Sequence, residues 1–185
     1  MRLNRVVLQQ LCDRAKQDVD DGLAFGGVEG CTLAIGYQGE LVYEQGFGQA
    51  RPDTPILMLS VTKTVLEGAL WKLFSRGLKP ETPVVEFLPE FMGGTQPEIT
   101  IAMVETHLAG FAWHRLDYPD AADHHKRLAA FSAWRLEQPP GRYEYNPVNG
   151  AWVLAEIIER VAGRDYLQFL KDEVLLPLQL GDVAT

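Results

Sequence analysis

Only one stretch of this sequence, within residues 30–48, has the pattern of β-strands. β-Branched and aromatic residues are frequent over 31–37 and 41–45, and Gln38-Gly39 between them suits a tight turn. An isolated two-stranded hairpin is only marginally stable in water. The hairpin therefore has to be covered closely by helices, or to pair with strands that these 185 residues do not include.

The remaining segments have the spacing and the end signals of helices. Apolar residues recur at helical spacing over 1–17 and over 61–75, and Arg76-Gly77 forms a helix stop signal. Further helices are predicted after Thr100, over 120–138, over 151–163 and after Asp165, whereas the proline-rich segment 79–94 is predicted to be a packed loop. The predicted order is one helix, two strands and then almost entirely helix.

The composition argues against several partners. A net charge of −8, a pI near 5.0 and the lack of a Lys/Arg run disfavour nucleic acid and anionic membranes. No apolar stretch approaches the ~20 residues that span a bilayer. The N-terminus lacks the apolar core of a signal peptide, so a cytoplasmic location is expected. Cys12 and Cys31 have no metal-binding spacing, and two buried thiols are expected rather than a disulfide.

Ser60-Val61-Thr62-Lys63 allows two interpretations. Ser60 could cap the following helix through its hydroxyl. Alternatively, residues three apart share one helix face, so the Lys63 amine could reach the Ser60 hydroxyl and act as its base. Burial lowers the pKa of a lysine, and a helix N-terminus favours negative charge on the oxygen. S-x-x-K has this role in β-lactamases and penicillin-binding proteins.

The wider sequence resembles the serine β-lactamase-like family, which includes class C β-lactamases, penicillin-binding-protein-like proteins, D-aminopeptidases and related esterases. The likeness covers about residues 25–182 in the family's order. It is carried by GCTLAIGYQGELVYEQGFGQA, LSVTKTVLEGALWKLFSRGLKPETPVVEFLPEF, ITIAMVETHLAG, PPGRYEYNP followed by AWVLAEIIERVAG, and LLPLQL.

The resemblance implies an α/β (α+β) fold of the β-lactamase/transpeptidase type, present in part. Residues 1–185 are then a single, partial domain, with the N-terminal helix and hairpin in 1–55 and the nucleophile helix and helical region in 56–185. The family's third motif, K-T-G or H-x-G, lies on a strand beyond residue 185, and the other C-terminal strands are also absent. By resemblance, that strand supplies one N–H of the oxyanion hole.

The family's second motif, Y-x-N, implies that Tyr145 is the proton-transferring partner of Ser60 and Lys63. A phenol beside a cationic lysine can have a lowered pKa and act as a base or an acid. Tyr143 is the competing candidate. Where the family has asparagine, this sequence has Pro147, which has no side-chain donor or acceptor. The contacts of the family asparagine with the lysine and the substrate are therefore absent, or are made by Asn146 or Asn149.

The predicted function is hydrolysis of an ester or amide by Ser60, Lys63 and Tyr145 through an acyl-enzyme. The expected partner is a small-molecule ester, amide or β-lactam, and neither a cofactor nor a metal is implied. The first alternative is a β-lactamase or peptidase, which a penicillin would acylate. The second is a non-catalytic or incomplete relative that keeps the scaffold for binding or assembly. Exposed strand edges on such a fragment predict self-association.

Several conspicuous side chains are predicted to be structural. His107 is expected to make a structural hydrogen bond, and His114, His124 and His125 lack the spacing of metal ligands. The carboxylates of Glu156 and Glu159 are expected on a solvated helix face. Core or cleft packing is expected for the four tryptophans, namely Trp71, Trp113, Trp134 and Trp152.

Overall fold

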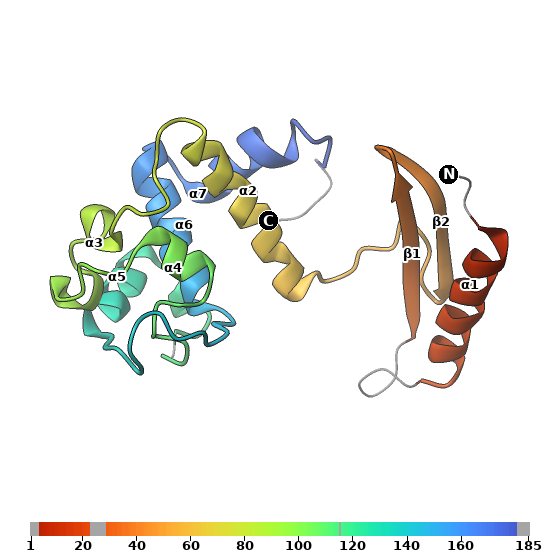
Figure 1. Cartoon of the computed structure of the whole chain (residues 1–185), viewed down its shortest axis with the longest axis horizontal. Coiled ribbons are helices and arrows are strands. Elements are labelled where there is room, and N and C mark those ends of the chain that lie inside the picture. The colour runs from red at the N-terminus through yellow and green to blue at the C-terminus, as the bar shows by residue number, and fades with distance from the viewer. Residues whose placement is uncertain (1–3, 23–28, 115, 181–185) are drawn as a thin grey trace. The chain divides into compact units, whose positions relative to one another are not determined.

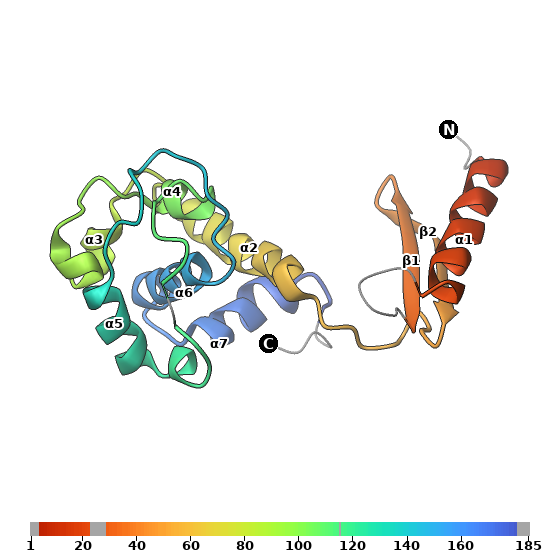
Figure 2. The ribbon, with the colours of Figure 1, turned by 90° about the horizontal axis from the view of Figure 1, so that it is seen from below.

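The computed structural model describes residues 4–22, 29–114 and 116–180. The chain divides into two compact units, Met1–Leu57 and Met58–Thr185. The first unit contains a helix and a β-hairpin, and the second is helical (Figures 1 and 2).

The N-terminal unit is built from α1 (Arg5–Asp20), β1 (Gly30–Tyr37) and β2 (Glu40–Gly48). The two strands pair antiparallel, with Gly30 opposite Gly48. Both residues of the predicted turn have positive φ, 53° at Gln38 and 82° at Gly39, as a two-residue turn with the twist of a hairpin requires. The hairpin is therefore confirmed, and β2 runs three residues further than predicted.

This unit buries little apolar surface. α1 contacts both strands, and the Cys12 thiol and the Tyr43 hydroxyl lie 2.8 Å apart. Cys12 and Cys31 are half-buried free thiols. Among the described residues of the unit, Phe47 and Ala50 are the hydrophobic residues that are buried, which agrees with the expectation that two strands alone make a weak core.

The C-terminal unit consists of helices joined by turns and loops. The α-helices are α2 (Thr62–Phe74), α3 (Val84–Phe87), α4 (Ile101–Glu105), α5 (His124–Ala133), α6 (Asn149–Ala162) and α7 (Tyr166–Leu170). The 3₁₀ turns are η1 (Leu59–Val61), η2 (Phe91–Gly94) and η3 (Asp120–Ala122), and η4 (Lys171–Leu175) is a π-helical turn that continues α7.

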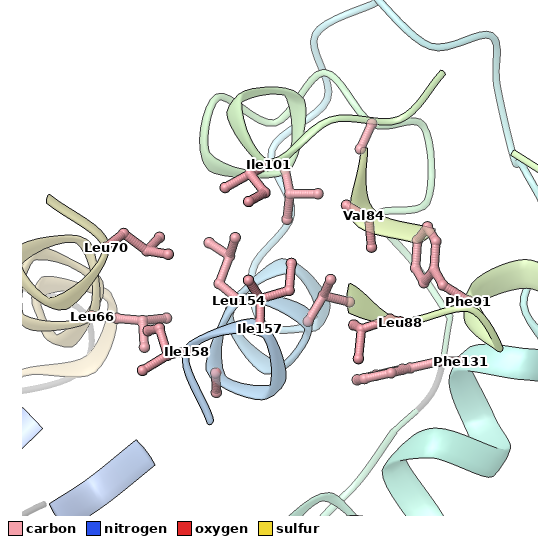
Figure 3. Close-up of a cluster of buried hydrophobic side chains, with 14 of the residues drawn as sticks. Leu66, Leu70, Val84, Leu88, Phe91, Ile101, Phe131, Leu154, Ile157 and Ile158 are labelled. Atoms are coloured by element: carbon pink, nitrogen blue, oxygen red, sulfur yellow. The ribbon is translucent and has the colours of Figure 1, made fainter. Parts of the chain in front are cut away.

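Helix α6 lies at the centre of the core of this unit. Figure 3 shows Leu66 and Leu70 of α2 facing the apolar side of α6. The other buried side chains labelled there are Val84, Leu88, Phe91, Ile101, Phe131, Leu154, Ile157 and Ile158. Burying each of these side chains contributes about 1.5–3 kcal/mol. Because α2 packs on α6, the residues at the start of α2 come close to the residues just before α6.

Two predicted segments differ from the structure. The 79–94 segment is packed as expected, but it contains α3 and η2. The helix predicted over 120–138 ends at Ala133, because Trp134 turns into the core and the backbone N–H of Glu137 donates to the carbonyl of Gly110. Within the described part of the chain, no helix is long and apolar enough to cross a membrane.

The prediction of a solvated face at Glu156 is wrong. Its side chain is 0% exposed, and Nε of Arg127, whose side chain is 4% exposed, donates to Oε1 at 2.6 Å. Nδ1 of His124 lies 3.1 Å from Oε1 and 3.0 Å from Oε2 of the same carboxylate, with hydrogen-bond geometry at Oε1. A buried carboxylate is stable only with such partners, so α6 and α5 are joined by an internal ion pair.

The tryptophans divide into two groups. Trp134 is buried and stacks between aromatic neighbours, and Trp152 is half-buried against the core, as predicted. Trp71 and Trp113 are mostly exposed, which corrects the expectation that all four pack in the core or a cleft. The indole N–H of Trp113 donates to Oε1 of Glu144 at 2.7 Å and so ties two loops together.

Candidate active site

Ser60 lies in η1, directly before α2. The capping position of α2 is Val61, and no side chain caps the helix there, so the interpretation of Ser60 as a cap is wrong. Leu59 has a φ of 47°, a left-handed conformation that costs a non-glycine residue about 1–2 kcal/mol. Such local strain is often found at functional turns. The Ser60 hydroxyl is exposed and free to meet other side chains.

The three residues predicted to act together are in hydrogen-bond contact. The Ser60 Oγ and the Tyr145 hydroxyl are 2.7 Å apart. The Lys63 Nζ donates to Ser60 Oγ at 3.0 Å, to the Tyr145 oxygen at 3.4 Å and to the backbone carbonyl of Pro147 at 2.6 Å. An ammonium group has three donors, and here each has an acceptor.

A turn after α4 positions Tyr145. The backbone N–H of Glu144 donates to the carbonyl of His107 at 3.0 Å, and the N–H of Asn146 donates to His107 Nδ1 at 3.3 Å. The two rings of His107 and Tyr145 meet edge to face with centroids 4.8 Å apart. His107 thus makes the structural hydrogen bond expected from the sequence, and it holds both neighbours of the tyrosine.

Tyr145, rather than Tyr143, contacts the serine. Tyr143 is 65% exposed, and its ring contact is with His107 at 6.1 Å. Hydrogen bonds from Ser60 and then from Lys63 lower the pKa of Tyr145 below its usual value of 10, against a smaller opposite effect of burial. Both donors stabilise the phenolate, so the arrangement favours a tyrosine that accepts the serine proton.

Asn146 and Asn149, the two candidates to replace the family asparagine, make contacts with the loop after Gly110. Both side chains are buried. The Asn146 amide donates to the carbonyl of Phe111 at 3.4 Å, and the Asn149 amide donates to the carbonyls of Ala112 and His114.

Pro147 itself supplies the acceptor for Lys63, through its backbone oxygen. The two buried amides hold the loop that follows Gly110, and substrate binding by Asn146 and Asn149 stays a prediction.

Two glutamates near Lys63 were not among the predicted site residues. Glu67 lies one turn after Lys63 on α2, and Glu105 ends α4. Both line a small cavity beside Lys63. The i, i+4 spacing of Lys63 and Glu67 was the one signal in the sequence that could have predicted that Glu67 lies near Lys63. No group of three potential metal ligands is present among residues 4–22, 29–114 and 116–180.

Comparisons with known proteins agree on one family. The family model described as Beta-lactamase matches residues 15–185. Esterase/beta-lactamase LipL of Mycobacterium tuberculosis is 28% identical, over 89% of this chain and 40% of the relative. Esterase EstB of Burkholderia gladioli is 27% identical, over 88% of this chain and 48% of the relative.

Solved structures confirm the predicted fold class. A penicillin-binding protein homologue from Caulobacter crescentus superimposes with a TM-score of 0.72 at 26% identity, over 90% of this chain and 48% of that structure. The fold is thus of the β-lactamase type, and the chain spans less than half the length of these curated relatives.

Proposed function

Because the chain belongs to the beta-lactamase family, we propose that its helical unit carries the acyl-transfer residues of a serine hydrolase that acts on small esters. The observation that carries the proposal is the 2.7 Å contact between Ser60 and Tyr145, with Lys63 donating to both oxygens. A nucleophile, a base and a group that orients the base are the parts that covalent acyl transfer needs.

In the proposed reaction, Tyr145 as phenolate accepts the proton of the Ser60 hydroxyl. The Ser60 oxygen then attacks the ester carbonyl carbon, and the N-terminus of α2 favours the negative charge that develops there. Tyr145 returns the proton to the alcohol oxygen as the C–O bond breaks, which leaves an acyl-enzyme. A water molecule, deprotonated by Tyr145, attacks the acyl carbon, and Ser60 leaves and regains its proton.

Lys63 acts as a hydrogen-bond donor in this cycle. Its three donors point at Ser60 Oγ, the Tyr145 oxygen and the Pro147 carbonyl, so the ammonium stabilises phenolate and serine oxygen without transferring a proton itself. This assignment narrows the role predicted from the sequence, in which Lys63 and Tyr145 shared the proton transfer.

Esters are preferred in this proposal over β-lactams for a chemical reason. Pro147 has no side-chain amide with which to bind the amide group of a penicillin, and its carbonyl is already occupied by Lys63. EstB is named an esterase and LipL an esterase/beta-lactamase, and both names are compatible with ester hydrolysis.

The test is intact-mass analysis after treatment with a fluorophosphonate, which reacts with activated serines. We expect one adduct on the 185-residue chain and none on Ser60→Ala. Tyr145→Phe should slow labelling by about 10²–10⁴-fold, the range for loss of a general base. Tyr143→Phe is the matched control and should label at the unchanged rate.

Turnover of p-nitrophenyl acetate, compared with acylation by a penicillin, then decides between esterase and β-lactamase chemistry. If no adduct forms on the folded chain at any pH, the proposal is wrong and the alternative of a non-catalytic scaffold is supported.

A further inference from the structure

His107 has a backbone conformation that is unusual for a histidine. It follows the last turn of α4 with a φ of 61°, a left-handed conformation that is normally adopted there by glycine and sometimes by asparagine. Its N–H donates to the carbonyl of Val104, and the N–H of Leu108 donates to the carbonyl of Met103, which is a common way for a helix to end. A histidine at this position is strained, and such strain is often found at functional positions.

This strained residue holds both neighbours of Tyr145. Its carbonyl accepts from the N–H of Glu144 at 3.0 Å, and its ring Nδ1 accepts from the N–H of Asn146 at 3.3 Å. Its ring also meets the ring of Tyr145 edge to face, with centroids 4.8 Å apart. A single residue therefore fixes the main chain before and after the tyrosine and contacts the side chain between them.

The hydrogen bond from Asn146 determines the form of the His107 ring. A backbone N–H can only donate, so Nδ1 has no proton, and the uncharged ring has its proton on Nε2. A charged ring has a proton on both nitrogens. Its Nδ1–H would oppose the N–H of Asn146, a residue that is 5% exposed, and this buried donor would lose its acceptor. The 144–146 segment would then have to move, and Tyr145 would move with it.

The surroundings of His107 favour the uncharged ring. Burial and then the charge of Lys63 lower the pKa of His107 below 6.5, and Glu67 opposes them in part. From α6, the residues that line the small cavities beside the ring are Gly150, Ala151 and Leu154, which do not titrate. The charged and titratable side chains that line these cavities or contact the ring are Lys63, Glu67, Glu105, Tyr143, Glu144 and Tyr145.

We propose that His107 is a positioning residue whose uncharged ring holds Tyr145 on Ser60, and that protonation of this ring inactivates the site by releasing the 144–146 segment. The inference rests on the proposed function, because its consequence is felt at the 2.7 Å contact between Tyr145 and Ser60. It adds a loss of activity in acid that is separate from the protonation of Tyr145 itself.

The first test compares two substitutions by the rate at which the fluorophosphonate labels Ser60 at about pH 8. Asparagine tolerates the left-handed conformation, and its Oδ1, bonded to Cγ like the histidine Nδ1, keeps an acceptor there. Glycine relieves the strain but removes both the acceptor and the ring. His107→Gly should label about 10²-fold more slowly, the effect of a misplaced catalytic group. His107→Asn should label no more than about tenfold more slowly, which corresponds to the loss of one ring contact.

The pH dependence of labelling tests the release of the segment. In the parent chain the rate should fall about tenfold per pH unit while Tyr145 alone is protonated, and about a hundredfold per unit once His107 is protonated as well. The asparagine amide does not titrate, so His107→Asn should keep the tenfold slope throughout. The neighbouring titratable groups are the same in both chains, so the difference in slope belongs to position 107. His125→Asn, at an exposed histidine, is the matched control and should keep the slopes of the parent.

Two NMR measurements on the whole chain do not need catalysis. Ring ¹⁵N spectra at about pH 8 should show His107 with a bare Nδ1 and a protonated Nε2, and loss of the signal in His107→Asn identifies it. With ¹³C at tyrosine Cζ, the Tyr145 midpoint should lie below 10 in the parent and move upward in His107→Gly. The reason is that the hydrogen bonds from Ser60 and Lys63, which lower the pKa of Tyr145, are then lost.

Three results would overturn the proposal. They are labelling of His107→Gly as fast as that of His107→Asn, equal acid slopes for the parent and His107→Asn, and a proton on Nδ1 of His107 at about pH 8. If His107→Gly does not fold, the slopes and the ring spectra still decide. If the fluorophosphonate labels none of the chains at any pH, the proposed function is wrong, while the ring spectra and the Tyr145 titration decide whether His107 positions the tyrosine.

Discussion

Removing the carboxylate of Glu156 should strongly destabilise the helical unit. Arg127 would keep its guanidinium inside the core, where its side chain is 4% exposed, with the carbonyl of Ala121 and two aromatic rings as its remaining contacts. An unpaired buried ion costs about 3–5 kcal/mol. We therefore expect Glu156→Ala to lower the free energy of unfolding by about that amount, which is about two to almost four powers of ten in the unfolding equilibrium.

The assay is urea unfolding followed by tryptophan fluorescence. All four tryptophans lie at or after position 71, so the signal reports on the C-terminal unit alone. Glu159→Ala, three residues along the same helix and only half-buried, is the matched control and should change stability by less than about 0.5 kcal/mol.

A double variant separates charge burial from loss of packing. Arg127→Met combined with Glu156→Leu removes both charges and keeps apolar side chains on Trp152 and Tyr166. It should be at least about 2 kcal/mol more stable than Glu156→Ala, since replacing a buried pair by apolar groups is often neutral. A cost below about 1 kcal/mol for Glu156→Ala, or a double variant no more stable than that single variant, would refute the reasoning.

Three other changes have defined outcomes. Gly110→Ala should lower the free energy of unfolding by several kcal/mol, because the added Cβ would lie 2.4 Å from a backbone oxygen. Gly163→Ala, with open space around it, should lower it by about 1 kcal/mol, and thermal unfolding of the two variants compares these losses. The rate at which the fluorophosphonate labels Ser60 should rise with pH, with a midpoint below 10. Lys63→Met should move that midpoint upward, because the Lys63 hydrogen bond helps to lower the pKa of Tyr145. An unchanged midpoint would contradict this role of the lysine. Glu105 has a raised pKa, so its contribution to stability is complete below about pH 4.5 and is lost as pH rises through about 7. Glu105→Gln should match the parent at about pH 4. At pH 8 its free energy of unfolding should exceed that of the parent by about 1–2 kcal/mol after allowance for solvent screening, and equal urea midpoints of variant and parent at pH 8 would contradict this.

The elements predicted correctly are those whose signals are local. The hairpin follows from alternation around a two-residue turn, and α2 and α6 follow from apolar spacing with a terminal glycine at Gly77 and Gly163. The proximity of Ser60 to Lys63 also follows from spacing, because three residues along a helix span one turn. That Tyr145 joins them depended on family resemblance, since spacing alone does not relate residues 85 positions apart.

Two of the errors arise from contact between distant segments. Glu156 looked solvated because the Arg127 that neutralises it lies 29 residues earlier, on another helix. The helix predicted over 120–138 stopped early because Gly110 offered a carbonyl to Glu137. Glu105 acquires its unusual environment only when α4 and α2 both pack against α6. Local patterns contain no information on such pairings.

The Pro147 carbonyl has a consequence for how this site can be probed and recognised. A substitution at position 147 changes the side chain but leaves the oxygen that accepts from Lys63, so an alanine scan would pass over one of three acceptors of that ammonium. A sequence search that demands asparagine at this position would likewise overlook proteins with the same contact. Replacing the 146–147 peptide linkage by an ester would leave the Pro147 oxygen in place, whereas altering the 147–148 carbonyl would test its contact with Lys63.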